Sequence, residues 1–238
     1  NKLNINLSIG DLLLNNDIEL KHVIIEQLNL FIYQSKLKNI RPKKVKPLLA
    51  SLIKKITSVI YIGQIDLKAC DITYEYEEKS MDGKVLKLSF DNSDITIKNL
   101  TNHPTYLEKN HTMEIIATSY FLNKGLVNIS SSFDLTSEID QFHIKGRLNK
   151  MDIKETNQLV EVFAPIKFTK GDIHSLDFKF DANSYSSTGT VDFNYSNIKF
   201  NIQKENDNTL VTYIPIMSLI ANKLARSNNN PEDKKYKP

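Results

Sequence analysis

The chain has 238 residues, of which 40% are hydrophobic and 25% are charged, as in ordinary folded soluble proteins. A formal net charge of only +3 excludes a strongly basic nucleic-acid-binding protein of the usual kind. The single cysteine, Cys70, excludes an intrachain disulfide and the small disulfide-stapled secreted folds. No apolar run approaches the roughly 18–20 residues of a membrane-spanning helix. Because the first residue is Asn and the end is a polar tail, we expect a fragment or processed form, with any signal sequence or anchor outside the chain.

Strand patterns dominate the chain from its beginning. Residues 2–9 alternate strictly between apolar and polar, which predicts a half-buried strand, and residues 10–15 and two runs within 17–34 continue in extended form. Turn-forming triplets at 81–83, 92–94, 123–125 and 206–208 predict a continuous antiparallel meander. The later strand candidates are 64–78, 84–90, 94–100, 112–122, 125–135, 140–149, 166–182, 187–204 and 209–214.

Three segments have apolar residues at helical spacing instead. The first, 47–60, opens with Pro47 and places six apolar residues on one side: Leu48, Leu49, Leu52, Ile53, Ile56 and Ile60. The second, 152–163, begins with Asp152 and Glu155 in a capping-box relation, and the third is 215–226. Short helices of this kind commonly cover an end or an opening of a large sheet.

Together these patterns predict a mainly β protein. We expect a large, strongly curved antiparallel β-sheet meander, a groove or half-barrel, because a sheet of so many strands twists and curls. Two or three short amphipathic helices would cover it. Residues 1–226 would form one elongated domain, with a sub-division near 100–112 as the alternative, and 227–238 a disordered polar tail.

The clearest pattern lies in residues 142–202, which read as strand, short helix, long strand, turn and long strand. A strand with one apolar face predicts a surface that lies against something apolar. A lipid chain on such a face would gain about 0.8 kcal/mol per buried CH₂ group. The alternative is that the helices at 47–60 and 152–163 fill the same face. The candidate lining residues are Leu176, Phe178, Phe180, Val191, Phe193 and Tyr195, with Ile72, Tyr74 and Tyr76 aligned in the same way within 64–78.

Catalytic and metal-binding motifs are not found in the sequence. There is no GxSxG, P-loop, GxGxxG or HExxH, and the five histidines include no pair at i,i+4 spacing. The segment 91–94 resembles the start of a calcium loop but lacks its Gly and its terminal Glu, which favours a turn. We therefore expect a non-enzymatic protein with no catalytic residues, metal or cofactor. A hydrolase with paired carboxylates is the alternative.

One segment, 36–55, holds eight cationic residues and no Asp or Glu. Attraction to an anionic membrane surface would gain about 1 kcal/mol for each nearby cation. The alternative, which we favour, is a solvated loop and the polar side of a helix that covers the core. Nucleic-acid binding is not expected, because no aromatic residues interleave with the cations. The candidate membrane-surface residues are Lys43, Lys44, Lys46, Lys54 and Lys55.

Residues 60–231 carry a pattern of glycines and alternating apolar positions that resembles AsmA-like bacterial envelope proteins, in the form of their carboxy-terminal region found in Bacteroidetes. The matching motifs are Ile65-Asp66-Leu67-Lys68, Ile72-Thr73-Tyr74-Glu75, Gly146-Arg147-Leu148, Met151-Asp152, Asn157, Ala164-Pro165, Gly171 to Phe178, Thr188 to Lys199, Ile220-Ala221-Asn222 and Ser227 to Pro231. They are short, and the first sixty residues match only in general character.

The resemblance implies a periplasmic protein, anchored to the inner membrane by an amino-terminal helix that is not present in this chain. It implies a non-enzymatic segment that shields or conducts lipid acyl chains along an apolar sheet face, contributing to outer-membrane lipid homeostasis or assembly. The implied partners are lipid acyl chains or a membrane surface, together with other envelope proteins, and no nucleic acid. The alternative is a structural or protein-interaction module of the cell envelope with a closed hydrophobic core.

Overall fold

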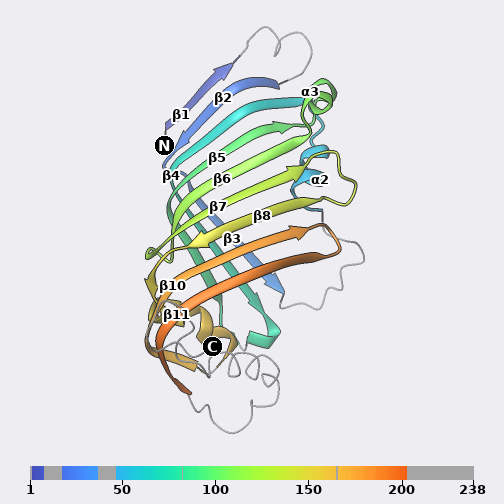
Figure 1. The fold of residues 1–238 in the computed structure, drawn as a ribbon. Coiled ribbons are helices and arrows are strands. Elements are labelled where there is room, and N and C mark those ends of the chain that lie inside the picture. The colour runs from blue at the N-terminus through green and yellow to red at the C-terminus, as the bar shows by residue number, and fades with distance from the viewer. Residues whose placement is uncertain (1, 8–17, 37–46, 82, 165, 203–238) are drawn as a thin grey trace.

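The computed structural model describes residues 2–7, 18–36, 47–81, 83–164 and 166–202. Its strands form one large sheet that is not closed into a barrel, with the order β1-β2-β4-β5-β6-β7-β8-β10-β11, while β3 pairs with β4 and β9 with β10 off this path (Figure 1). The strands are β1 (Lys2–Leu7), β2 (Ile18–Glu26), β3 (Asn29–Lys36), β4 (Ile60–Glu78), β5 (Leu86–Thr101), β6 (Thr112–Phe121), β7 (Gly125–Asp134), β8 (Phe142–Leu148), β9 (Met151–Asp152), β10 (Ile166–Ala182) and β11 (Ser187–Ile202). The helices are α2 (Leu49–Lys54), α3 (Pro104–Lys109) and α4 (Asn157–Phe163), with 3-10 turns η1 (Lys79–Met81) and η2 (Ile153–Thr156).

The sheet is mixed, so the prediction of a wholly antiparallel meander was wrong. Both β2 and β3 run parallel to β4. They follow one another along the same edge of β4 and are separated by a break at Gln27. Parallel neighbours need a crossover connection, and here that connection contains α2. The antiparallel prediction is confirmed from β4 through β8 and for the β10–β11 pair.

The predicted turn at 92–94 is a β-bulge within one long strand, β5. Asn92 has a φ of 48°, and its N–H donates to Asp71 Oδ1 of β4 at 2.9 Å. On β4, Ala69 has a φ of 49° and its N–H donates to Asp94 Oδ1 at 3.1 Å. Short polar side chains thus satisfy the backbone groups that the bulges free, so β5 continues where the local sequence indicated a stop.

The helix predicted over 47–60 is shorter than expected. Helix α2 ends at Lys54, and Ile60 already belongs to β4, where its N–H donates to the Asn102 side chain at 2.7 Å. The helix predicted over 152–163 is confirmed as η2 and α4. Asp152 accepts from the Lys154 N–H at 2.9 Å, while Glu155 pairs with Lys124 at 3.9 Å. The segments 10–15 and 209–226 and the tail lie outside the described residues.

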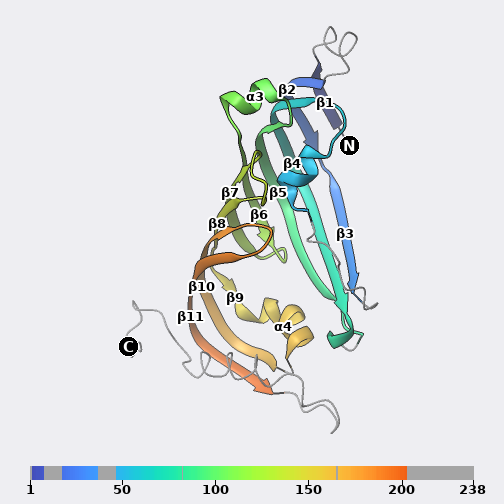
Figure 2. The same cartoon turned by 90° about the vertical axis from the view of Figure 1, so that its right-hand side faces the viewer.

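Two hydrophobic cores lie on one face of the sheet, which we call the inner face. The α2 core consists of Ala50, Ile53, Met113 and Leu135. The α4 core consists of Val127, Leu148, Met151, Ile153, Phe168, Ile173, Tyr195 and Ile198. Figure 2 shows α2 and α4 on the same side of the strands, near opposite ends of the sheet. The other side of the sheet is the outer face.

Candidate functional site

A row of apolar residues crosses the inner face from β2 to β11, and we call it the inner row. Each member is half-buried except Val191, which is 53% exposed. Because neighbouring strands lie about 4.8 Å apart, eight strands give the row a length of roughly 34 Å. Its members are directly paired neighbours: Ile25, Leu67, Ile95, Ala117, Ile129, Gly146, Phe178 and Val191.

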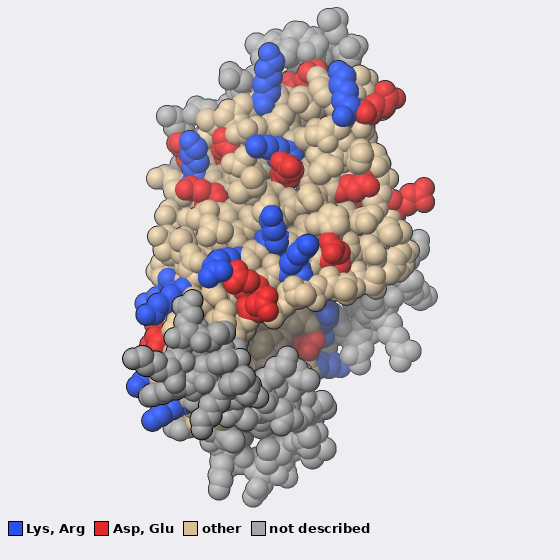
Figure 3. Space-filling view, viewed as in Figure 1, with Lys and Arg blue, Asp and Glu red and all other residues tan. Residues whose placement is uncertain are grey.

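A second row lies two residues further along each strand and is apolar at most positions. It consists of Val23, Ile65, Ile97, Ile115, Ser131, Ile144, Phe180 and Gly189. The residues between the two rows point to the outer face, because side chains alternate along a strand. These are Ile24, Asp66, Thr96, Ile116, Ser130, Lys145, Lys179 and Thr190, and Figure 3 shows both charge signs interspersed on that face. The sheet thus separates an apolar face from a polar one.

Several polar side chains on the outer face pair with one another. Asp66 accepts hydrogen bonds from the His22 ring at 2.7 Å and from the Thr96 hydroxyl at 2.8 Å. Arg147 donates to both carboxylate oxygens of Asp177 at 3.0 and 2.9 Å. A shallow hollow of about 500 Å³ lies here, with the Arg147–Asp177 pair in its wall. These pairs suit a solvated face, where an exposed ion pair contributes about 0–1 kcal/mol.

Helix α2 is held on the inner face by the carboxylate of Asp140, which is 3% exposed. It accepts from the N–H groups of Leu48 and Ser51 at 3.2 and 2.5 Å, from the Ser51 hydroxyl at 2.8 Å and from the Ser184 hydroxyl at 3.0 Å. Burial by itself would raise the pKa of Asp140, but these hydrogen bonds outweigh it and hold the pKa below its ordinary value. The carboxylate thereby joins α2 to the β10–β11 hairpin.

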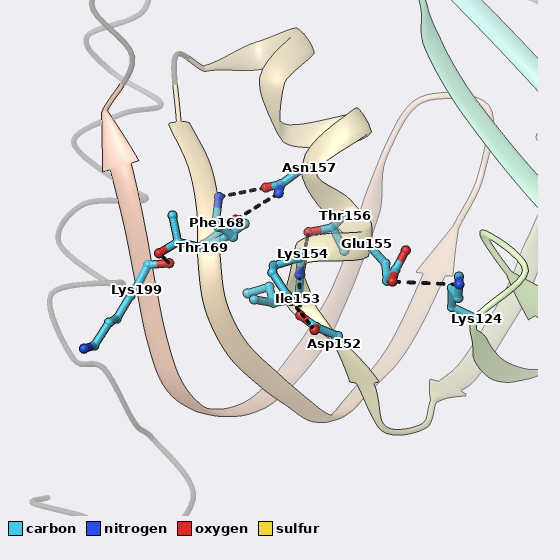
Figure 4. Close-up of polar contacts among 10 residues, drawn as sticks. All are labelled: Lys124, Asp152, Ile153, Lys154, Glu155, Thr156, Asn157, Phe168, Thr169 and Lys199. Carbon is cyan, nitrogen blue, oxygen red and sulfur yellow. Dashed lines mark hydrogen bonds and ion pairs between the residues drawn. The ribbon is translucent and has the colours of Figure 1, made fainter.

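The η2–α4 segment is fixed to β10 by Asn157. Its side-chain amide donates to the Phe168 carbonyl at 3.0 Å, and its side-chain oxygen accepts from the Phe168 N–H at 2.7 Å (Figure 4). The Thr156 hydroxyl donates to the Ile153 carbonyl at 2.6 Å within the preceding turn. Because α4 contacts both β10 and β5, this segment covers the inner face at the end of the sheet remote from α2.

The predicted lining residues of β10 and β11 share one face, but they differ in burial. Tyr195 is 5% exposed and belongs to the α4 core, against which Leu176 and Phe193 also pack. Phe178 and Phe180 are half-buried with their ring centroids 6.1 Å apart. Only Phe178, Phe180 and Val191 of the six therefore lie outside that core.

Ile72, Tyr74 and Tyr76 also share the inner face, since Ile72 pairs with Phe90, which packs against the α4 core. All three are half-buried. The Tyr74 hydroxyl donates to Gln34 at 3.2 Å and the Tyr76 hydroxyl to Glu78 at 2.6 Å. These tyrosines therefore place hydrogen-bonded hydroxyl groups beside the apolar surface at the carboxy-terminal end of β4.

Of the predicted membrane-surface residues, Lys43, Lys44 and Lys46 lie outside the described residues. Lys54 and Lys55 are exposed at the end of α2, and the Lys54 ammonium donates to the Ser137 carbonyl at 2.6 Å. Lys54 thus has a structural contact with the loop before β8. Only Lys54 and Lys55 of the five can therefore be placed on the surface.

The inner row also contains residues that the sequence did not indicate as lining candidates: Ile25, Leu67, Ile95, Ala117 and Ile129. Each sits in an alternating strand pattern, but only the register of the strands shows that they line up with Phe178. The described part of the chain contains no cluster of three or more side chains suited to hold a metal ion. None of its helices is long and apolar enough to cross a membrane.

Comparisons with models of known protein families, with curated proteins and with solved structures found no match to this chain. The resemblance to AsmA-like proteins is therefore a prediction from the sequence alone.

Proposed function

We propose that this chain is a non-enzymatic segment of a bacterial envelope protein that shields or conducts lipid acyl chains along its inner face. The observation that carries the proposal is the inner row, which is apolar on eight successive strands and backed by a polar outer face. An acyl chain needs no hydrogen bonds, and each CH₂ group buried against such a row gains about 0.8 kcal/mol.

The proposal needs a sheet that curves into a groove. Two observations support this. Helix α4 contacts both β5 and β10, which are separated in the sheet order by β6, β7 and β8. Strands β4 and β5 also carry bulges at Ala69 and Asn92, and a bulge is a feature that bends a strand. The groove would run across the strands between α2 and α4. Within it, Ile95, Ala117 and Phe178 belong to neither core.

The cellular setting rests on the sequence resemblance. We place the segment in the periplasm, tethered to the inner membrane by a helix outside this chain, with a role in outer-membrane lipid homeostasis or assembly. The second candidate is a structural or interaction module of the envelope with a filled inner face. Burial of Tyr195, Ile173 and Ile198 in the α4 core favours it.

Two variants with the same substitution on opposite faces test the proposal. Ile95→Asp places a charge in the inner row, whereas Ile116→Asp places it on the outer face of the next strand, where Ile116 is 48% exposed. The readouts are uptake of a fluorescent fatty acid, lipid that co-purifies in native mass spectrometry, and circular dichroism. We expect the unsubstituted protein and Ile116→Asp to bind the probe, and Ile95→Asp to stay folded and lose binding.

Two results would count against lipid binding. One is an unsubstituted protein with neither co-purified lipid nor probe uptake, and the other is equal uptake by both variants. Unfolding of Ile95→Asp together with no uptake by the unsubstituted protein would favour the filled module.

A further inference from the structure

Strand β3 exposes four successive large hydrophobic side chains. Leu30 and Ile32 are each 43% exposed, Phe31 is 62% exposed and Tyr33 is 53% exposed. Leu30 and Ile32 lie on the inner face, beside Ile72 and Tyr74 of β4, and Phe31 and Tyr33 lie on the outer face. An exposed apolar strand is the kind of surface that natural proteins usually cover or interrupt with charge.

The second edge of β3 has no strand beside it among the residues that the structure describes. β1 covers the matching edge of β2, but its pairing ends with Lys2 opposite Glu26, just before β3. The Leu28 carbonyl accepts from the Asp71 N–H of β4 at 2.9 Å. Since alternate residues of a strand bond to the same neighbour, the backbone groups of Phe31 and Tyr33 face the uncovered edge.

The chemistry of this edge favours a strand over a lipid bilayer as its occupant. Backbone N–H and C=O groups without partners are costly in hydrocarbon, whereas an added strand satisfies them and covers side chains on both faces. The sequence of β3 is moreover complementary to itself. Its one charged residue, Lys36, stands at the end, so antiparallel pairing of two copies sets no like charges opposite each other.

We propose that two copies of this chain pair antiparallel through β3, with the twofold axis at Ile32. In this register Phe31 lies opposite the partner's Tyr33, and the same aromatic pair occurs again across the axis. In this register Leu30 lies opposite the other copy's residue 34, so residues of the inner face meet residues of the inner face. The backbone groups of Phe31 and Tyr33 then bond across the dimer, and Ile32 meets its own copy.

The expected dimer is weak. Eight residues a side are fewer than the 20–30 of an interface of standard size, so we expect a dissociation constant on the order of 10 µM or weaker. The proposal does not rest on lipid binding, and either one can fail without the other.

Sedimentation equilibrium of the whole chain over a concentration series tests the dimer. Ile32→Lys sets two ammonium groups against each other on the axis and should leave the protein monomeric. Ile116→Lys makes the same change at a similarly exposed outer-face site and should leave dimerisation unchanged. Circular dichroism checks that both variants fold. A monomer at every concentration, or an Ile32→Lys protein that dimerises like the unsubstituted one, overturns the proposal.

Cysteine cross-linking tests the register. At a non-hydrogen-bonded antiparallel pair the Cα atoms are about 4.5 Å apart, within reach of a disulfide. Ile32→Cys should therefore form a covalent dimer under mild oxidation, several-fold more than Phe31→Cys, which faces the partner's Tyr33. The native Cys70 is 1% exposed and provides the background. Stronger cross-linking at 31 than at 32 overturns the register. A monomer that floats with phosphatidylcholine–phosphatidylglycerol vesicles, and loses this with Ile32→Lys, would assign the edge to a membrane and overturn the dimer.

Discussion

The ring of Phe178 on β10 lies over Gly146 on β8, so that a Cβ atom at position 146 would come within 2.4 Å of Phe178 Cζ. The same atom would lie 2.8 Å from the backbone oxygen of Asn128 on β7. Glycine at this position lets an aromatic ring pack directly on the backbone of the neighbouring strand. Packing at the middle of the inner row therefore requires the Phe178 ring on β10 and a residue without a side chain at position 146 of β8.

Gly146→Ala is expected to lower the free energy of unfolding by about 1–3 kcal/mol, because the Phe178 ring and the β7 backbone must both shift. Chemical denaturation measures the loss. The double variant Gly146→Ala with Phe178→Leu should recover part of it, since the shorter side chain leaves room for the methyl group. If Gly146→Ala costs as much in the Phe178→Leu protein as in the unsubstituted one, the ring does not oppose the substitution.

Asn157→Ala is expected to loosen the η2–α4 segment. It removes both hydrogen bonds to the backbone of Phe168, a residue that is only 6% exposed, and should cost about 1–3 kcal/mol. Hydrogen exchange should then be faster at the Phe168 amide than in the unsubstituted protein. Gln158→Ala, at the exposed neighbouring position of α4, is the control and should leave that amide protected. Equal exchange in the two variants would contradict the anchoring role of Asn157.

Strand β11 carries a buried residue, Tyr195, and an exposed one, Val191, on the same face. Tyr195→Ala should destabilise the protein by about 3–5 kcal/mol, as expected for a large aromatic residue in a packed core. Val191→Ala should change stability by less than about 0.5 kcal/mol, because the side chain is half exposed. Thermal or chemical unfolding checks both. Similar losses at the two positions would mean that β11 is packed alike along its length.

The same two residues show what the sequence could and could not predict. Alternation of apolar and polar residues correctly placed both on one face of a strand, because side-chain direction is a local property. It could not show that η2 and α4 cover Tyr195 and not Val191. That difference depends on where the chain returns after β8, which is decided by contacts between distant residues.

Whether neighbouring strands run parallel or antiparallel could likewise not be predicted from the sequence. The run that became β2 and β3 alternates in the same way whether its neighbour is parallel or antiparallel, so local patterns gave no sign of the parallel pairs with β4. The bulge at Asn92 was interpreted as a turn because Asn, Ser and Asp favour turns. The same residue types also tolerate a positive φ and supply the hydrogen bonds of a bulge. Only the pairing of β5 with a strand on each side distinguishes a bulge from a turn.

Protonation of Asp140 should lower the stability of the folded protein in acid. Hydrogen bonds hold its folded pKa below the unfolded value of about 3.9, so the carboxylate adds stability at neutral pH that is lost as the pH falls below about 4, through the folded pKa. Asp140→Asn keeps the shape and tolerates the φ of 54°. We expect it to be about 1–3 kcal/mol less stable at neutral pH, with the gap to the unsubstituted protein narrowing in acid. Urea unfolding over a pH series measures this, with Asp192→Asn, at an exposed position of β11, as the control. A gap that does not depend on pH would contradict the role of the Asp140 charge in accepting these hydrogen bonds.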